Sequence, residues 1–198
     1  MLSDKQKDAI TEIVNIGVGK GSATLSQMLD EEILLNVPYV NLISFDKILE
    51  EFNNLDVQMV NSVELQFYGN FNGVANVVLS TESADHLVSV LTRESVGSES
   101  ITQLKDGVIT EVGNIILNGV MGSFGNILNA PLEYQIPKSF EGDIKDLYHS
   151  LDKEMFSQIL ICRTDFSIEG KNIKGEVLIM YEINSFQKLK EILDTMIA

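Results

Sequence analysis

The chain lacks most of the residues from which disulfides and metal centres are built. Among its 198 residues there is one cysteine, Cys162, and the two histidines, His86 and His149, are far apart in the sequence. A disulfide within the chain is therefore impossible, and a zinc site with cysteine and histidine ligands is not expected. We predict no metal site of the protein's own.

Positive charge is also scarce. The chain has 14 lysines and arginines against 29 aspartates and glutamates, which gives a formal net charge of -15 at pH 7. Nucleic acids and anionic membranes are bound through clusters of basic side chains, so we expect neither as a partner. The expected partners are proteins whose surfaces are neutral, basic or locally complementary.

Long apolar runs and linker-like segments are missing as well. The first residues, Met1 to Lys5, have no apolar core of a signal peptide, and no run reaches the roughly 18 apolar residues of a membrane span. No segment rich in proline, or in glycine and serine, marks a domain boundary. Because 44% of the residues are apolar, one compact core can form. We predict a soluble, cytoplasmic protein.

What the chain does contain is a polar motif that occurs twice. Each copy reads E-x2-N-x22-P: Glu12, Asn15 and Pro38 in the first, Glu111, Asn114 and Pro137 in the second. The copies are 99 residues apart, half the length of the chain, and residues 8–38 share seven identities with residues 107–137 without a gap. Retained spacing indicates an internal duplication. We predict a single domain made of two repeats, about 1–99 and 100–198.

Hydrophobic periodicity predicts the same order of elements in both halves. In the first half we predict a helix over 4–29 capped by Ser3 or Asp4, a strand over 33–37 that ends at a proline, a short helix over 44–52 capped by a serine, a hairpin with strands at 63–68 and 74–79, and a helix over 83–92. In the second half we predict a helix over 102–128, a strand over 132–136, a short helix over 142–151, a hairpin with strands at 158–166 and 173–181, and a helix over 185–197. The fold class is α/β in the α+β sense: a pseudo-twofold, duplicated αβαββα unit with a six-stranded, mainly antiparallel sheet and packed helices.

The polar residues of the motif share one side of each long helix. At 100° per residue, Asp8, Glu12 and Asn15 lie within about 60° of one another, opposite the apolar side. Glu111 and Asn114 are related in the same way on the second helix. Both helices are rich in glycine, which predicts that their backbones pack closely on the sheet. These glycines are Gly17, Gly19, Gly21, Gly113, Gly119 and Gly122.

The residue types limit the chemistry of such a site. A carboxamide is neither a nucleophile nor a general base, but it can orient a water molecule through hydrogen bonds. A glutamate can hold a lysine or arginine of a partner through a charge-assisted hydrogen bond. Glutamate and asparagine are also ordinary on a solvent-exposed helix face, and it is their presence in both copies that favours a site. This site is incomplete alone and needs a partner that supplies the electrophile and a metal.

At these residues the chain resembles the CheC, CheX and FliY family of chemotaxis phosphatases, whose pattern is D/S-x3-E-x2-N-x22-P. Asp8, Glu12, Asn15 and Pro38 meet this pattern in full. The resemblance implies a hydrolase that removes the aspartyl phosphate of a CheY-like receiver, the phosphorylated domain of a response regulator. It implies that Asn15 aligns the attacking water, that Glu12 engages the receiver's lysine and that Asp8 contributes to binding. Magnesium would come with the receiver, so no cofactor of the protein's own is expected.

The second copy departs from the pattern at one position. Gly107 stands where aspartate or serine is expected, whereas Glu111 and Asn114 are present. We expect this site to keep the water-positioning amide and to bind the receiver less well. Two copies in one chain of this length resemble CheC more than the shorter CheX or the longer FliY, and the resemblance makes the deamidase CheD a candidate partner. The alternatives are a non-catalytic module that binds a receiver, CheD or the flagellar switch, and a dimer that uses these helices as its interface.

Overall fold

The computed structural model describes residues 2–30, 32–54, 58–150, 155–168 and 171–197. The helices in this part of the chain are α1 (Asp4–Leu29), α2 (Ile48–Asn54), α3 (Thr81–Thr92), α4 (Glu99–Ile127), α5 (Ile144–Ser150) and α6 (Ile183–Ile197), with a 3-10 helix at Phe45–Lys47. The strands are β1 (Ile33–Ser44), β2 (Met59–Gly69), β3 (Gly73–Ser80), β4 (Leu132–Tyr134), β5 (Lys138–Asp143), β6 (Phe156–Ile168) and β7 (Lys171–Glu182).

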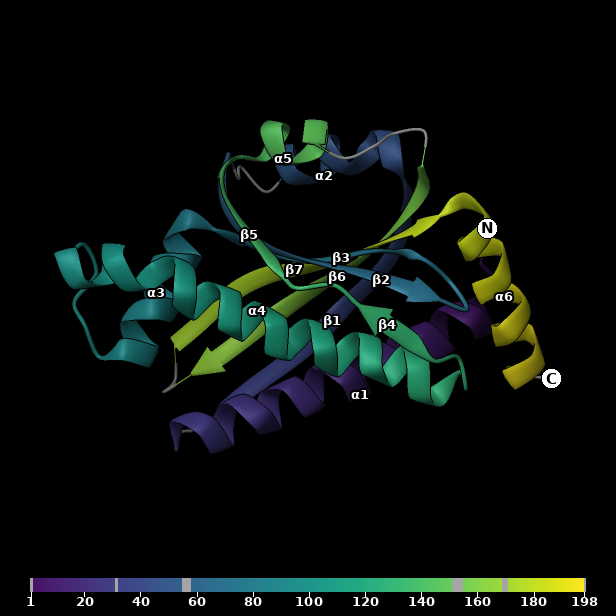
Figure 1. The fold of residues 1–198 in the computed structure, drawn as a ribbon, viewed down its shortest axis with the longest axis horizontal. Coiled ribbons are helices and arrows are strands. Elements are labelled where there is room, and N and C mark those ends of the chain that lie inside the picture. Colours follow the sequence, from purple (N-terminus) through teal and green to yellow (C-terminus); the bar gives the residue numbers. More distant parts are fainter. Residues whose placement is uncertain (1, 31, 55–57, 151–154, 169–170, 198) are drawn as a thin grey trace.

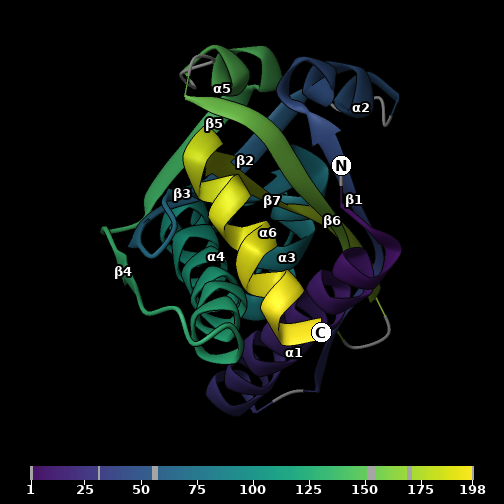
Figure 2. The same ribbon diagram turned by 90° about the vertical axis from the view of Figure 1, so that its right-hand side faces the viewer.

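The strands form one curled sheet between two helical layers (Figure 1). Among the described residues the sheet has seven strands in the order β1-β6-β7-β3-β2-β4, with β5 also paired to β2, and every pair is antiparallel. The long helices α1 and α4 lie side by side on one face, and the short helices α2 and α5 cover the other (Figure 1). Helix α6 crosses one end of the molecule beside α1 (Figure 2).

The predicted fold class is confirmed, but the predicted count of six strands is wrong by one. The segment that contains Pro137 is split into β4 and β5, and β5 was not predicted. The corresponding strand of the first half is β1. It was predicted to end at Pro38, but it runs on to Ser44. Its register against β6 shifts between Asn36 and Tyr39. A proline is tolerated there because β1 is an edge strand and the ladder is already irregular at this point.

Serine caps fix where both long helices begin. Ser3 and Gln6 form a capping box at the start of α1, and Ser98 accepts a hydrogen bond from the backbone N–H of Ile101 at the start of α4. The predicted cap at Ser44 is wrong, because its side chain accepts no hydrogen bond and the chain enters α2 through a 3-10 helix. The predicted turn of the second hairpin and the predicted end of the short helix at 151 include residues outside the described ranges.

The apolar sides of the helices produce two separate cores. The larger lies between the sheet and the layer of α1 and α4, and the smaller lies under α2 and α5. In the described residues, no helix combines the length and the low polarity that crossing a membrane would require. Burial of the apolar sides leaves the polar sides of α1 and α4 facing solvent.

Candidate functional site

The predicted residues of the first copy lie on the solvent side of α1. Asp8 and Glu12 are exposed and Asn15 is partly exposed, whereas Ile13 and Val14 between them are buried. The amphipathic pattern of the sequence explains this arrangement, because burial of the apolar side leaves the polar side in solvent. The carboxylates and the carboxamide are thus accessible to another protein.

The second copy has the same orientation on α4. Glu111 is exposed and Asn114 is partly exposed, while Val112 and Ile116 are buried in the core. The structure does not bring the two copies together into a single active centre, since each Glu–Asn pair lies on its own helix. It presents the same pair of side chains twice, once on each helix.

Glycines set the contact between α1 and α4. A Cβ atom added at Gly17 would lie 2.4 Å from the Cα atom of Val120, and one added at Gly21 would lie 3.2 Å from the Cα atom of Ile116. One added at Gly119 would lie 2.5 Å from the carbonyl oxygen of Gly17. Since rising numbers on one helix meet falling numbers on the other, the helices are antiparallel. The two helix backbones can approach this closely only because glycine has no side chain at these positions.

This contact corrects the predicted role of the glycines. Gly17, Gly21 and Gly119 were expected to pack on the sheet, but they pack on the neighbouring helix. Gly113 does approach the sheet, where an added Cβ would lie 2.6 Å from the side chain of Val63. Gly19 and Gly122 have no neighbour within 4 Å of an added Cβ and serve no packing purpose.

The two sites point to opposite flanks of the helix pair. Asn15 is two residues from Gly17, which places it about 160° around α1 from the contact with α4. Asn114 stands in the same relation to Ile116, which Gly21 contacts. Each carboxamide therefore faces away from the other helix.

The two carboxamides differ in their hydrogen bonds. The Nδ2 group of Asn118 donates to Oδ1 of Asn114 over 2.7 Å, one turn along α4. Asn15 makes no side-chain hydrogen bond within the described part of the chain, and the residue one turn beyond it at the matching position is Gly19. Sequence reasoning missed Asn118 because it compared the two copies for differences only at the positions of the motif, and Asn118 lies outside the motif.

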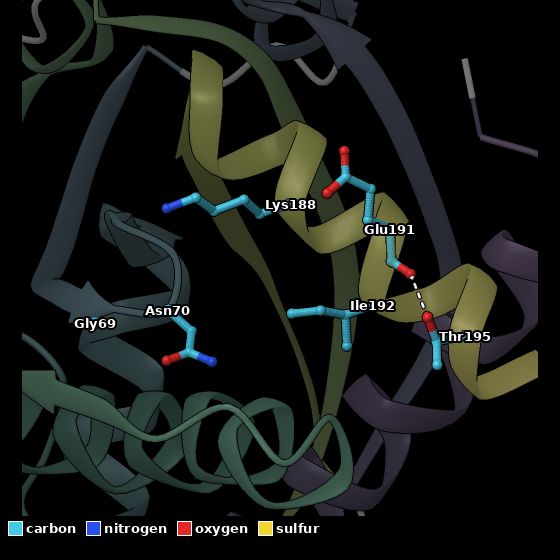
Figure 3. Close-up of a pocket in the computed structure, with 6 residues that line it drawn as sticks. All are labelled: Gly69, Asn70, Lys188, Glu191, Ile192 and Thr195. Carbon is cyan, nitrogen blue, oxygen red and sulfur yellow. Dashed lines mark hydrogen bonds between the residues drawn. The ribbon is translucent and has the colours of Figure 1, made fainter.

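The described part of the molecule has other polar features outside the repeated motif. Groups of three or more histidine, cysteine or acidic residues that could bind a metal do not occur in the described ranges. A groove of about 510 Å³ lies between the β2–β3 turn and α6, where Asn70, Lys188 and Glu191 face it (Figure 3). No residue of the repeated motif lines that groove.

A perturbed carboxylate lies on the other face of the sheet. Burial raises the pKa of Glu176 to about 7, although the guanidinium of Arg163 opposes this shift. Arg163 also contacts Glu51 of α2 over 3.0 Å, so the cluster joins α2 to the sheet. Its position beneath α2 makes it a structural contact and not part of either Glu–Asn site.

Comparison with solved structures defines the fold. FliY from Thermotoga maritima superposes with a TM-score of 0.77 at 19% identity, over 99% of each chain. CheX in a CheX–CheY–BeF3–magnesium complex from Borrelia burgdorferi gives 0.53 at 20% identity, over 87% of this chain and 99% of that one. The FliM middle domain from H. pylori gives 0.61 at 12% identity, over 96% and 99%. The chain therefore has the fold shared by CheX, FliY and the FliM middle domain.

Comparison of sequences adds a curated relative. The CheY-P phosphatase CheC of Bacillus subtilis (strain 168) is 22% identical over 200 residues, which cover 95% of this chain and 93% of the relative. No family model matches the chain. The resemblance to the CheC, CheX and FliY family that the motif predicts is confirmed.

Proposed function

We propose that this protein is a phosphatase that hydrolyses the aspartyl phosphate of a CheY-like receiver. The observation that carries the proposal is the pair of accessible sites on α1 and α4, each with a glutamate and an asparagine turned to solvent. Its similarity to a CheY-P phosphatase supports the same substrate class. The receiver of the CheX–CheY–BeF3–magnesium complex supports a partner that brings its own magnesium.

The two side chains have separate roles in the proposed reaction. Asn15 or Asn114 enters the receiver's active site and hydrogen-bonds the attacking water, which fixes its direction towards phosphorus. The water oxygen forms a bond to phosphorus as the bond to the aspartyl oxygen breaks, which yields inorganic phosphate and a free aspartate. Glu12 or Glu111 binds the receiver's lysine through a charge-assisted hydrogen bond. Asp8 adds a second carboxylate to the binding surface of the first site.

We also propose that the chain is one domain of two repeats. An offset of 99 residues relates α1 to α4, β2 to β6 and β3 to β7 within a few residues. The strand order is symmetric about the β7–β3 pair, with β6 and β2 next and β1 and the β4–β5 segment at the edges. The reciprocal contacts of Gly17 with Val120 and of Gly21 with Ile116 agree with a twofold relation.

The proposal is tested by the decay of a phosphorylated receiver in the presence of magnesium. The wild type should accelerate the decay, Asn15→Ala should remove most of the acceleration, and Asn114→Ala should remove the smaller remainder. The double variant should leave only the receiver's own decay rate, because both water-positioning amides are then gone. In each single variant the loss should fall on kcat more than on KM. Asn126→Ala is the matched control, since Asn126 is an exposed asparagine on α4 outside the motif. If the wild type leaves the decay rate of the phosphorylated receiver unchanged, the proposed phosphatase activity is ruled out.

The second candidate is a binding module without turnover, which the likeness to FliM middle domains favours. It predicts that the wild type binds the phosphorylated receiver, in a titration by fluorescence anisotropy, while the decay rate stays the same. Glu12→Ala and Glu111→Ala should then weaken binding, and Asn15→Ala should have little effect. CheD stays a proposed further partner, to be tested by the same titration.

A further inference from the structure

We propose that Asn118 is a positioning residue of the second site, which holds the carboxamide of Asn114 in the orientation needed to direct water. The proposal rests on the proposed function, because it concerns the same reaction. It assigns a role to a residue outside the E-x2-N-x22-P motif. It also makes the two sites unlike in how their amides are held.

The first step of the argument is geometric. Asn118 lies one turn beyond Asn114 on the solvent side of α4, and its Nδ2 donates to Oδ1 of Asn114 over 2.7 Å. This bond holds the Oδ1 end of the Asn114 amide against Asn118 and does not use the Nδ2 donors of Asn114. One lone pair of its Oδ1 also stays free. The amide can still both donate and accept in the direction of a partner.

The second step compares the two copies. The position of α1 that corresponds to Asn118 is Gly19, which has no side chain to offer. Packing does not require this glycine, because an added Cβ would meet nothing within 4 Å. Asn15 therefore has to be ordered when a receiver binds, whereas Asn114 is ordered beforehand. Ordering an asparagine side chain costs part of its rotamer entropy.

The third step concerns rate. A catalytic group that is already oriented reaches the reactive geometry more often, so preorganisation raises kcat and leaves binding nearly unchanged. A residue that merely stabilised the helix would not separate kcat from KM in this way. Side-chain pairs four residues apart also stabilise helices slightly, so the effect of each substitution on helix stability has to be controlled.

The experiment isolates the second site in an Asn15→Ala background and measures kcat and KM for decay of the phosphorylated receiver. Asn118→Ala should lower kcat about three- to tenfold with KM changed less than about twofold. Alanine favours the helix more than asparagine does, so a weaker helix cannot explain this loss. Gln187→Ala is the control, since it removes a similar bond to Glu191 on α6. It should leave kcat unchanged.

The reciprocal variant tests the same idea as a gain. In an Asn114→Ala background, Gly19→Asn should raise the kcat of the first site. It should also reduce the mobility of the Asn15 side chain, as measured from its NH2 resonances in a ¹H–¹⁵N spectrum. An unchanged or higher kcat in Asn118→Ala overturns the positioning role. The role is also overturned if the wild type is active but the Asn15→Ala protein is not, because the second site then has no activity of its own. If the wild type itself is inactive, the proposed function fails together with this role, and the spectra then report only the hydrogen bond.

Discussion

Helices α1 and α4 carry the same Glu–Asn pair but surround it differently. On α1, Asp8 lies one turn before the pair and Gly19 one turn after it; on α4, Gly107 lies before it and Asn118 after it. Each helix thus has one additional polar side chain, at opposite ends of the pair. Under the proposed function, α1 gains an anionic contact with the receiver, whereas α4 gains an oriented amide. On that proposal, receiver binding and water positioning are divided unequally between the two helices.

The helices also differ in how their N-terminal turns are anchored. At matching positions, Gln6 of α1 donates to Asp194 of α6 over 2.8 Å, and Lys105 of α4 contacts Asp85 of α3 and Glu141 of β5 over 2.9 and 3.0 Å. One anchor is a neutral amide and the other a buried cation between two carboxylates. The contact at Gly17, by contrast, is common to both helices.

The largest effect is expected where the helices share their contact. Gly17→Ala should lower the free energy of unfolding by about 2–3 kcal/mol, because the new Cβ lies 2.4 Å from the backbone of α4 and the helices must separate. Gly19→Ala is the matched control and should stabilise by up to about 1 kcal/mol, since it meets no neighbour and favours the helix. Urea unfolding measures both. Equal effects of the two substitutions would contradict the packing argument.

An intermediate effect is expected at the anchor of α4. Burial alone would lower the pKa of Lys105, but the hydrogen bonds and charges of Asp85 and Glu141 outweigh it and raise the pKa above its ordinary 10.5. Lys105→Gln should cost about 1–2 kcal/mol of unfolding free energy, because the two carboxylates lose their cation. Gln6→Ala on α1 should cost about 1 kcal/mol or less.

The pH dependence of the same pair has a defined sign. A raised pKa in the folded state means that the stabilisation by Lys105 is complete below 10.5 and is lost as the pH rises through the folded value. The difference in unfolding free energy between wild type and Lys105→Gln should therefore be constant from about pH 6 to about pH 9 and should narrow above 10.5. Denaturant titrations across this range measure it. A difference that already narrows near neutral pH would show that the ion pair does not anchor the helix.

The sequence allowed much of this comparison to be predicted, and physical reasons explain the rest. Periodicity located α1 and α4 and the solvent side of each, because apolar spacing reports burial directly. It could not report that Gly17 contacts Val120, since a partner about 100 residues away leaves no local pattern. It also could not report that Pro38 interrupts a ladder without ending a strand, which depends on β1 being at an edge. When the two halves of the sequence are aligned, Asn118 stands opposite Gly19, so the difference could be read from the sequence. The bond from Asn118 to Asn114 could not, because it depends on side-chain geometry.

The smallest effect is expected at the residue by which α4 departs from the motif. In an Asn15→Ala background, Gly107→Asp should lower KM for the phosphorylated receiver about two- to threefold and leave kcat unchanged, because an exposed carboxylate contributes only modestly to binding. There is room for it, since an added Cβ at Gly107 meets nothing within 4 Å. Gly122→Asp adds the same charge at another open position of α4 and should leave KM unchanged. The gain should shrink as salt screens the charge. If kcat changes instead, or if Gly122→Asp has the same effect, aspartate at this position does not act by docking the receiver, and the difference between the two sites then rests on Asn118 alone.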